Sequence, residues 1–234
     1  MIIIDYLHFV FCGYKAYISF YMRCLLDNFE QKHWETVYST RSVSELDWYE
    51  ESPEQSMQLI EKCNLDPFDI ILDVGSGAST LIDHLLQSRH RQVIAMDISH
   101  QALKISQQRL GKNSEKVKWI VEDLLQPVQI KNISNVALWH DRAVLQFFTR
   151  PEQRNAYFKI MNAIVKVNGF VIIAAFSMGG ETKCSGLDIV NYNEMMISKH
   201  LGNRYKLLDA IEHTCTTPNG GPRPYIYTRF LKIE

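Results

Sequence analysis

The chain has 234 residues, of which 46% are hydrophobic and 22% are charged, and its formal net charge is -1. This length fits one domain, alone or with an extension, and the composition excludes disorder as the dominant state. Because 25 Lys and Arg are balanced by 26 Asp and Glu, we expect no nucleic-acid partner.

Residues 1–26 are far more apolar than the rest of the chain. A secretory signal would place Lys or Arg ahead of the apolar stretch, whereas Asp5 comes first here. Charged residues at positions 5, 15 and 23 interrupt the stretch, so no membrane span is expected. The segment is either an extra helix covering the domain or sequence upstream of the true start, for which Met22 is a candidate. The domain itself is predicted over residues 27–234.

From residue 54 onward, short apolar runs alternate with helical patterns. Helices are predicted over residues 54–64, 79–87 and 100–110, the last capped by Ser99, and buried parallel strands over residues 70–74, 93–96, 117–121 and 136–140. A capping box at residues 149–152 opens the next helix, Asn168 and Gly169 end it, and residues 170–176 form the fifth strand.

The last part of the chain has a different pattern. A helix is predicted over residues 192–201, and strands over residues 205–216 and 225–232. The short turn-rich link between these strands, residues 218–222, leaves no room for a crossover helix, so the strands must run antiparallel. We therefore expect an α/β fold whose mostly parallel sheet ends in an antiparallel hairpin.

The cysteines and histidines indicate in which compartment the protein is expected and whether it has a metal site. The five cysteines are scattered and form no CxxC pair, so we expect reduced thiols and a cytoplasmic protein. The eight histidines form no HExxH motif and no cluster with cysteine, so no metal site is predicted. For Cys184 and Cys215, isolated structural thiols are favoured over a thiol acceptor or a soft-metal site.

A glycine-containing loop links the strand at residues 70–74 to the following helix. Gly75 and Gly77 allow a sharp turn and the close approach of a ligand to the backbone. Asp97 ends the next strand, where a carboxylate can accept hydrogen bonds from both hydroxyls of a ribose. A dinucleotide site would need a third glycine where Thr80 stands, and Asp73 would repel a pyrophosphate. The residues therefore favour a cationic nucleoside, S-adenosylmethionine, over NAD.

Three motifs together resemble those of the class I S-adenosylmethionine-dependent methyltransferases. They are Asp73-Val74-Gly75-Ser76-Gly77, then Asp97 with Ile98, and Val121-Glu122-Asp123-Leu124, and the resemblance extends over roughly residues 31–234. It implies a Rossmann-like three-layer sandwich with a seven-stranded, mostly parallel sheet and an antiparallel last strand. It also implies that the Asp73–Gly77 loop surrounds the methionine moiety, that Asp97 holds the ribose and that Asp123 accepts a hydrogen bond from the adenine amino group. Ile98 and Leu124 are also expected to bind the cofactor. The expected product is S-adenosylhomocysteine.

Further motifs look like those of the methyltransferase-like proteins that modify protein lysines. We assign no substrate from this resemblance. They lie at residues 34–38, 46–49, 138–144 and 184–187. The Asn-Pro-Pro-aromatic signature of amino-purine methyltransferases is absent after the fourth strand, where Trp139-His140-Asp141-Arg142 stands instead. This departure argues against methylation of DNA bases.

Four aromatic residues precede the first core strand: Trp34, Tyr38, Trp48 and Tyr49. They either pack a lid against the sheet edge or keep water from the reactive sulfonium, and the sequence leaves both open. His140 is expected to line the pocket or to be a satisfied core histidine, rather than a general base.

Asp141 follows the fourth strand and is our candidate for positioning the methyl acceptor. The alternative is an ion pair with Arg142 that only holds the loop. The expected function is methyl transfer to a protein side chain or a small molecule. A non-catalytic S-adenosylmethionine-binding module and, less favoured, a nicotinamide-dependent oxidoreductase are the alternatives.

Overall fold

The computed structural model describes residues 29–234. The expected apolar extension over residues 1–26 and the candidate start at Met22 lie outside the described residues. Within residues 29–234, no helix is both long enough and apolar enough to cross a bilayer.

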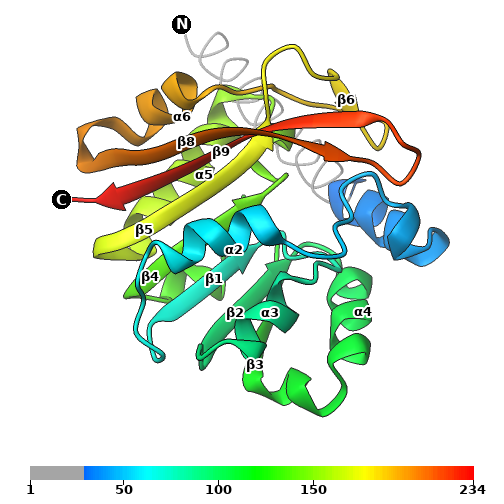
Figure 1. Ribbon diagram of the computed structural model, residues 1–234, viewed down its shortest axis with the longest axis horizontal. Coiled ribbons are helices and arrows are strands. Elements are labelled where there is room, and N and C mark those ends of the chain that lie inside the picture. The colour runs from blue at the N-terminus through cyan, green and yellow to red at the C-terminus, as the bar shows by residue number, and fades with distance from the viewer. Residues whose placement is uncertain (1–28) are drawn as a thin grey trace, which may run out of the picture.

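A seven-stranded sheet forms the centre of the fold, in the order β3-β2-β1-β4-β5-β9-β8 (Figure 1). The strands are β1 (Ile70–Val74), β2 (Gln92–Asp97), β3 (Val117–Val121), β4 (Val136–Arg142), β5 (Val165–Phe176), β8 (Tyr205–Thr216) and β9 (Pro222–Lys232). Strands β1 to β5 pair in parallel, whereas β9 is antiparallel to both β5 and β8. The predicted mostly parallel sheet with an antiparallel last strand is confirmed.

Helices cover both faces of the sheet and give three layers. One face carries α2 (Glu54–Glu61), α3 (Leu81–Gln87) and α4 (His100–Leu110), and the other carries α5 (Pro151–Ile164) and α6 (Glu194–Leu201). Side chains alternate along each strand, so Ile71 joins the core under α2 and α3 while Leu72 joins the core under α5. Residues 29–40 are also helical, and this segment packs near α4 through Val37 and Ala102.

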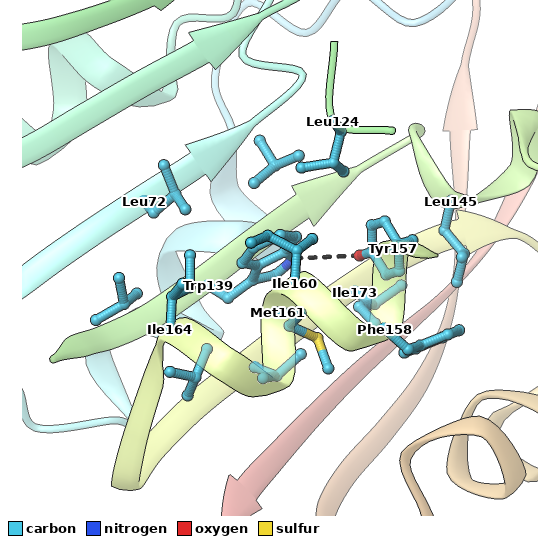
Figure 2. Packing of buried hydrophobic residues seen from close by; sticks show 14 of the residues in the cluster. Leu72, Leu124, Trp139, Leu145, Tyr157, Phe158, Ile160, Met161, Ile164 and Ile173 are labelled. Carbon is cyan, nitrogen blue, oxygen red and sulfur yellow. Dashed lines mark hydrogen bonds between the residues drawn. The ribbon is translucent and has the colours of Figure 1, made fainter. Parts of the chain in front are cut away.

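The core beneath α5 is built around a paired tryptophan and tyrosine (Figure 2). Trp139 of β4 donates its indole N–H to the Tyr157 hydroxyl of α5 at 3.1 Å, and the two rings meet edge to face at 5.5 Å. Both side chains are fully buried, so this bond satisfies a polar group that would otherwise be costly to bury. The pair fixes the carboxyl end of β4, from which several site residues project.

Some element boundaries differ from the sequence predictions. The helix predicted to end at Asn168 and Gly169 ends at Ile164, and β5 begins at once at Val165. Asn168 adopts a φ of 62°, and the pairing of β4 with β5 shifts register there, so these residues form a bulge inside the strand. The start of α5 is capped one residue later than predicted, because the Gln153 side chain accepts the Arg150 backbone N–H at 3.1 Å, while the Arg150 side chain has no acceptor and makes no cap bond. Ser99 caps α4 as predicted.

Candidate functional site

Two cavities lie at the carboxyl ends of β1, β2 and β4. Both are also lined by residues of the N-terminal part of the described chain, whose ribbon is blue in Figure 1. One cavity is larger than the other, and both are concave sites at the strand ends, of the kind in which small-molecule ligands bind. They share four lining residues, namely Tyr38, Trp48, Gly75 and Arg142. The predicted site residues divide between them: Trp34, Asp97, Ile98, Asp123 and Leu124 line the larger, and Tyr49, Asp73, Ser76, Gly77 and His140 line the smaller.

The loop after β1 requires glycine at two positions. Gly75 and Gly77 have φ angles of 59° and 54°, in the left-handed region that side chains disfavour. A Cβ atom at Gly75 would overlap the Val144 side chain, and one at Gly77 would lie 2.5 Å from the Tyr38 hydroxyl oxygen. The backbone of Ser76 donates to Met96 O at 2.8 Å, which ties the loop to β2. The loop is therefore a tight cradle between two strand ends.

Asp97 is buried at the end of β2 and holds this cradle in place. Its two carboxylate oxygens accept backbone N–H bonds from Gly77 and Ser99, both at 2.8 Å. Burial raises the pKa of Asp97 to about 6, against the opposing effect of these two bonds, and the nearby charges of Asp73 and Glu35 raise it further. A ligand that donates hydrogen bonds or carries positive charge would stabilise the ionised carboxylate.

Asp73, the second buried carboxylate, has one oxygen bound and one free. Its Oδ1 lies 2.7 Å from His140 Nδ1, and His140 Nε2 lies 3.0 Å from Ser56 Oγ. The other oxygen, Oδ2, has no hydrogen-bond partner among residues 29–234. Because Asp73 and Asp97 flank the same glycine loop, the electrostatics favour a cation there and oppose a phosphate.

The residues after β3 bound the larger cavity. The Asp123 Oδ1 atom accepts the backbone N–H of Leu125 at 2.8 Å, which shapes the turn that carries Leu124. Glu122 accepts three backbone N–H groups, from residues 128–130, and so fixes the following loop. Both acidic residues therefore help to hold the cavity wall, and the sequence analysis had assigned no role to Glu122.

The four predicted lid aromatics do come together at the cavities. Trp34 packs edge to face on Trp48 at 5.5 Å and on Phe147 at 5.0 Å, and Trp48 donates its indole N–H to the Tyr38 hydroxyl at 3.2 Å. Tyr49 lines the smaller cavity beside them. The aromatic side chains pack together and also cover the site, so both of the proposed roles are compatible with the geometry.

Glu35 anchors this lid, a contact that the sequence analysis missed. Its carboxylate accepts the backbone N–H groups of His100 and Gln101, at 2.7 and 3.0 Å, and the Ser99 hydroxyl at 3.1 Å. A carboxylate at a helix N-terminus satisfies unpaired backbone donors and is favoured by the helix dipole. The helical residues 29–40 are thereby fixed to the start of α4, next to Asp97.

Arg142 is a second residue whose place in the site was missed. It lines both cavities and is held by the Tyr227 hydroxyl at 3.0 Å, the Trp48 carbonyl at 2.8 Å and the Glu50 carboxylate at 2.8 Å. Its guanidinium also lies over the Tyr225 ring. Arg142 therefore joins the end of β4 to the segment that carries Trp48 and Glu50, and to β9.

Asp141 does not occupy the position expected of an acceptor-positioning residue. It is fully buried and lines neither cavity, and its carboxylate accepts Val144 N at 3.0 Å, Leu145 N at 3.2 Å and the Tyr157 hydroxyl at 2.6 Å. Nor is it paired with Arg142, which binds Glu50. The physical reason is strand alternation, which turns Asp141 toward α5 and its neighbour His140 toward α2. The geometry supports a structural role in the turn after β4.

Two further buried side chains line the larger cavity. The Oε1 atom of Gln146 accepts Phe176 N at 3.1 Å, and its Nε2 donor has no partner within the described part of the chain. Cys184 lies near Arg223, and burial raises the pKa of its thiol to about 11, so it is uncharged at neutral pH. Nowhere in residues 29–234 do three His, Cys, Asp or Glu side chains gather in a way that could hold a metal ion.

Comparison with known proteins places this site in a family context. Residues 71–169 match the family described as methyltransferase domain. The chain is 23% identical over 157 residues to EEF1A lysine methyltransferase 2 of Mus musculus, an alignment that covers 62% of this chain and 64% of that protein, less than two thirds of its length.

Solved structures agree in fold. A S-adenosylmethionine-dependent methyltransferase from Anabaena variabilis has a TM-score of 0.70 at 14% identity, over 88% of this chain and 95% of that one. The N-methyltransferase NodS from Bradyrhizobium japonicum, in complex with S-adenosylhomocysteine, has a TM-score of 0.65 at 14% identity, over 86% and 100%. The chain therefore has the Rossmann-like fold of the class I methyltransferases.

Proposed function

We propose that the protein transfers the methyl group of S-adenosylmethionine to a protein side chain or a small molecule. The observation that carries this proposal is the pair of buried carboxylates, Asp73 and Asp97, that flank the glycine loop. The cofactor carries a sulfonium and an ammonium group and no phosphate, so it matches the charge of this cradle.

The residues present fit the cofactor from end to end. Asp97 would accept the ribose hydroxyls through the lone pairs that its backbone bonds leave free, and Asp73 Oδ2 would accept the ammonium group. Asp123 and Leu124 line the cavity where the adenine would lie. Gly75 lines both cavities, and Asp73, Ser76 and Gly77 line the smaller one, where the methionine moiety would lie.

When bound, the cofactor supplies an electrophilic methyl group on its sulfonium sulfur. The chain's own contribution is to align donor and acceptor and to exclude water, and orientation of this kind can lower a barrier by roughly 7–11 kcal/mol. Trp34, Tyr38 and Trp48 cover the site and would keep water out, while Glu35 holds the lid helix in place.

A nicotinamide cofactor fits these residues less well. Its pyrophosphate would have to lie between Asp73 and Asp97, where two carboxylates would repel it. Its helix packing would also require glycine where Thr80 stands. A non-catalytic binding module would keep the same cofactor residues, and only an activity assay separates it from an enzyme.

The acceptor class is supported only broadly. The curated relative is named as a lysine methyltransferase, whereas one structural neighbour at TM-score 0.63 is a 1,6-didemethyltoxoflavin-N1-methyltransferase from Burkholderia thailandensis, with 16% identity over 92% of this chain and 90% of that one.

The cysteines within the described residues, Cys63, Cys184 and Cys215, are free thiols, which supports a reducing compartment such as the cytoplasm.

The test is transfer of a labelled methyl group from S-adenosylmethionine to a fractionated cell lysate. We expect label to enter protein or small molecules with the unsubstituted chain and to be lost with Asp97→Asn. No transfer from a protein that binds S-adenosylhomocysteine would favour the non-catalytic module.

A further inference from the structure

Three buried polar side chains from three elements are joined in a row by hydrogen bonds beside the site. Ser56 of α2, His140 of β4 and Asp73 of β1 are 1%, 2% and 3% exposed. Asp73 and His140 are register partners on neighbouring parallel strands, so their side chains leave the sheet on the same face, the one that α2 covers. These three side chains are therefore held by a helix and two strands rather than by loops.

The hydrogen-bond partners determine which atoms of Ser56, His140 and Asp73 carry the protons. An Asp73 carboxylate can only accept, so His140 Nδ1 donates to Asp73 Oδ1 at 2.7 Å. A neutral imidazole then leaves Nε2 as an acceptor, and the Ser56 hydroxyl at 3.0 Å is placed to donate to it. Asp73 thus selects the tautomer of His140, Ser56 holds the ring through Nε2, and His140 in turn holds one oxygen of Asp73.

The order serine, histidine, aspartate is also that of a hydrolytic triad, but the geometry excludes that use. In such a triad the serine oxygen faces the substrate. Here Ser56 is buried on the inner face of α2 and lines neither cavity of the site, whereas Asp73 and His140 line the smaller one. The atom of the three side chains that has no partner within residues 29–234 is the buried Asp73 Oδ2, and Asp73 lines the smaller cavity whereas Ser56 does not, so the carboxylate and not the hydroxyl is placed to meet a ligand there.

We propose that His140, oriented by Ser56, is a positioning residue that fixes the Asp73 carboxylate so that Oδ2 receives the ammonium group of the cofactor's amino-acid end. This inference rests on the proposed function. Without the bond from His140, Asp73 could rotate about its side-chain torsions, and holding it in the binding orientation would then cost free energy on binding.

The test compares two ligands by calorimetry: S-adenosylhomocysteine, and 5′-methylthioadenosine, which lacks the amino-acid end. His140→Gln removes the donor at the Nδ1 position, and we expect Kd for S-adenosylhomocysteine to rise about tenfold while Kd for 5′-methylthioadenosine stays within about twofold. His140→Asn places an amide N–H near the Nδ1 position and should restore the ratio of the two Kd values. His84→Gln, a histidine of α3 that lines neither cavity, is the matched control.

Ser56→Ala gives an independent test if the His140 variants do not fold, with an expected rise of about threefold to fivefold for S-adenosylhomocysteine alone. The inference is overturned if His140→Gln leaves the ratio of the two Kd values unchanged, including the case in which both ligands weaken equally. If the unsubstituted protein binds neither ligand, the proposed function itself fails.

Discussion

Replacing Asp97 by Asn should separate cofactor binding from folding. Burial raises the pKa of Asp97 from 3.8 to about 6, so the folded protein holds that proton more tightly than the unfolded chain does. The folded protein therefore loses stability as the pH rises from about 4 to about 6, where the unfolded chain is ionised and the folded protein is not. At neutral pH the whole loss is present, about 3 kcal/mol for a difference of about two pH units. Asn removes this cost, because it carries no charge. However, its amide oxygen can accept only one of the two backbone N–H bonds, and the N–H left unpaired lowers the free energy of unfolding by about 1–3 kcal/mol. The two effects nearly cancel.

Ligand binding has no such compensation. The ribose hydroxyls lose a charged acceptor, and each bond of that kind contributes about 1.5–3 kcal/mol, so Kd for S-adenosylhomocysteine should rise at least tenfold. The assay pairs calorimetry at pH 7.5 with thermal unfolding in the absence of ligand, and uses Asp188→Asn, an exposed residue that lines neither cavity, as the control. Unchanged affinity for S-adenosylhomocysteine in the Asp97 variant would refute the reasoning.

Three further outcomes are expected. Asp141→Asn should leave label transfer and affinity for S-adenosylhomocysteine within about threefold of the unsubstituted values, and a hundredfold loss of transfer would restore its role at the acceptor. Gly77→Ala places a side chain at a φ of 54° against the Tyr38 hydroxyl, so the variant should lose about 1–2 kcal/mol of unfolding free energy and bind S-adenosylhomocysteine poorly. Adding Tyr38→Phe should restore part of the affinity. Unchanged affinity in Gly77→Ala would contradict the cradle geometry. Because ligand binding favours the ionised form of Asp97, affinity should fall as pH drops below about 6, and Asp97→Asn should show no such fall; a flat profile in the unsubstituted protein would count against this linkage.

Residues that act through local sequence were predictable. The strands of the parallel sheet are continuous apolar runs, the turn at Gly75 and Gly77 needs glycine, and Asp97 ends a strand whose carboxyl end must face the crevice. Each of these follows from a few neighbouring residues, and the structure brings them to one site.

Contacts between distant segments were not predictable in the same way. Glu35 meets the N-terminus of α4 and Arg142 meets Glu50 only because the sheet and lid place segments far apart in sequence side by side. Asp141 shows a different difficulty, since the sequence locates it at a strand end but the direction of its side chain depends on the register of β4. The bulge at Asn168 is likewise set by the pairing of β4 with β5.

The central claim is that the cradle between Asp73 and Asp97 holds a cationic nucleoside. The most direct measurement is calorimetric titration of the full 234-residue chain with S-adenosylhomocysteine and, in parallel, with NAD at pH 7.5. We predict saturable binding of S-adenosylhomocysteine at one site and none of NAD at the same concentrations. Equal binding of NAD, or binding of NAD alone, would contradict the account.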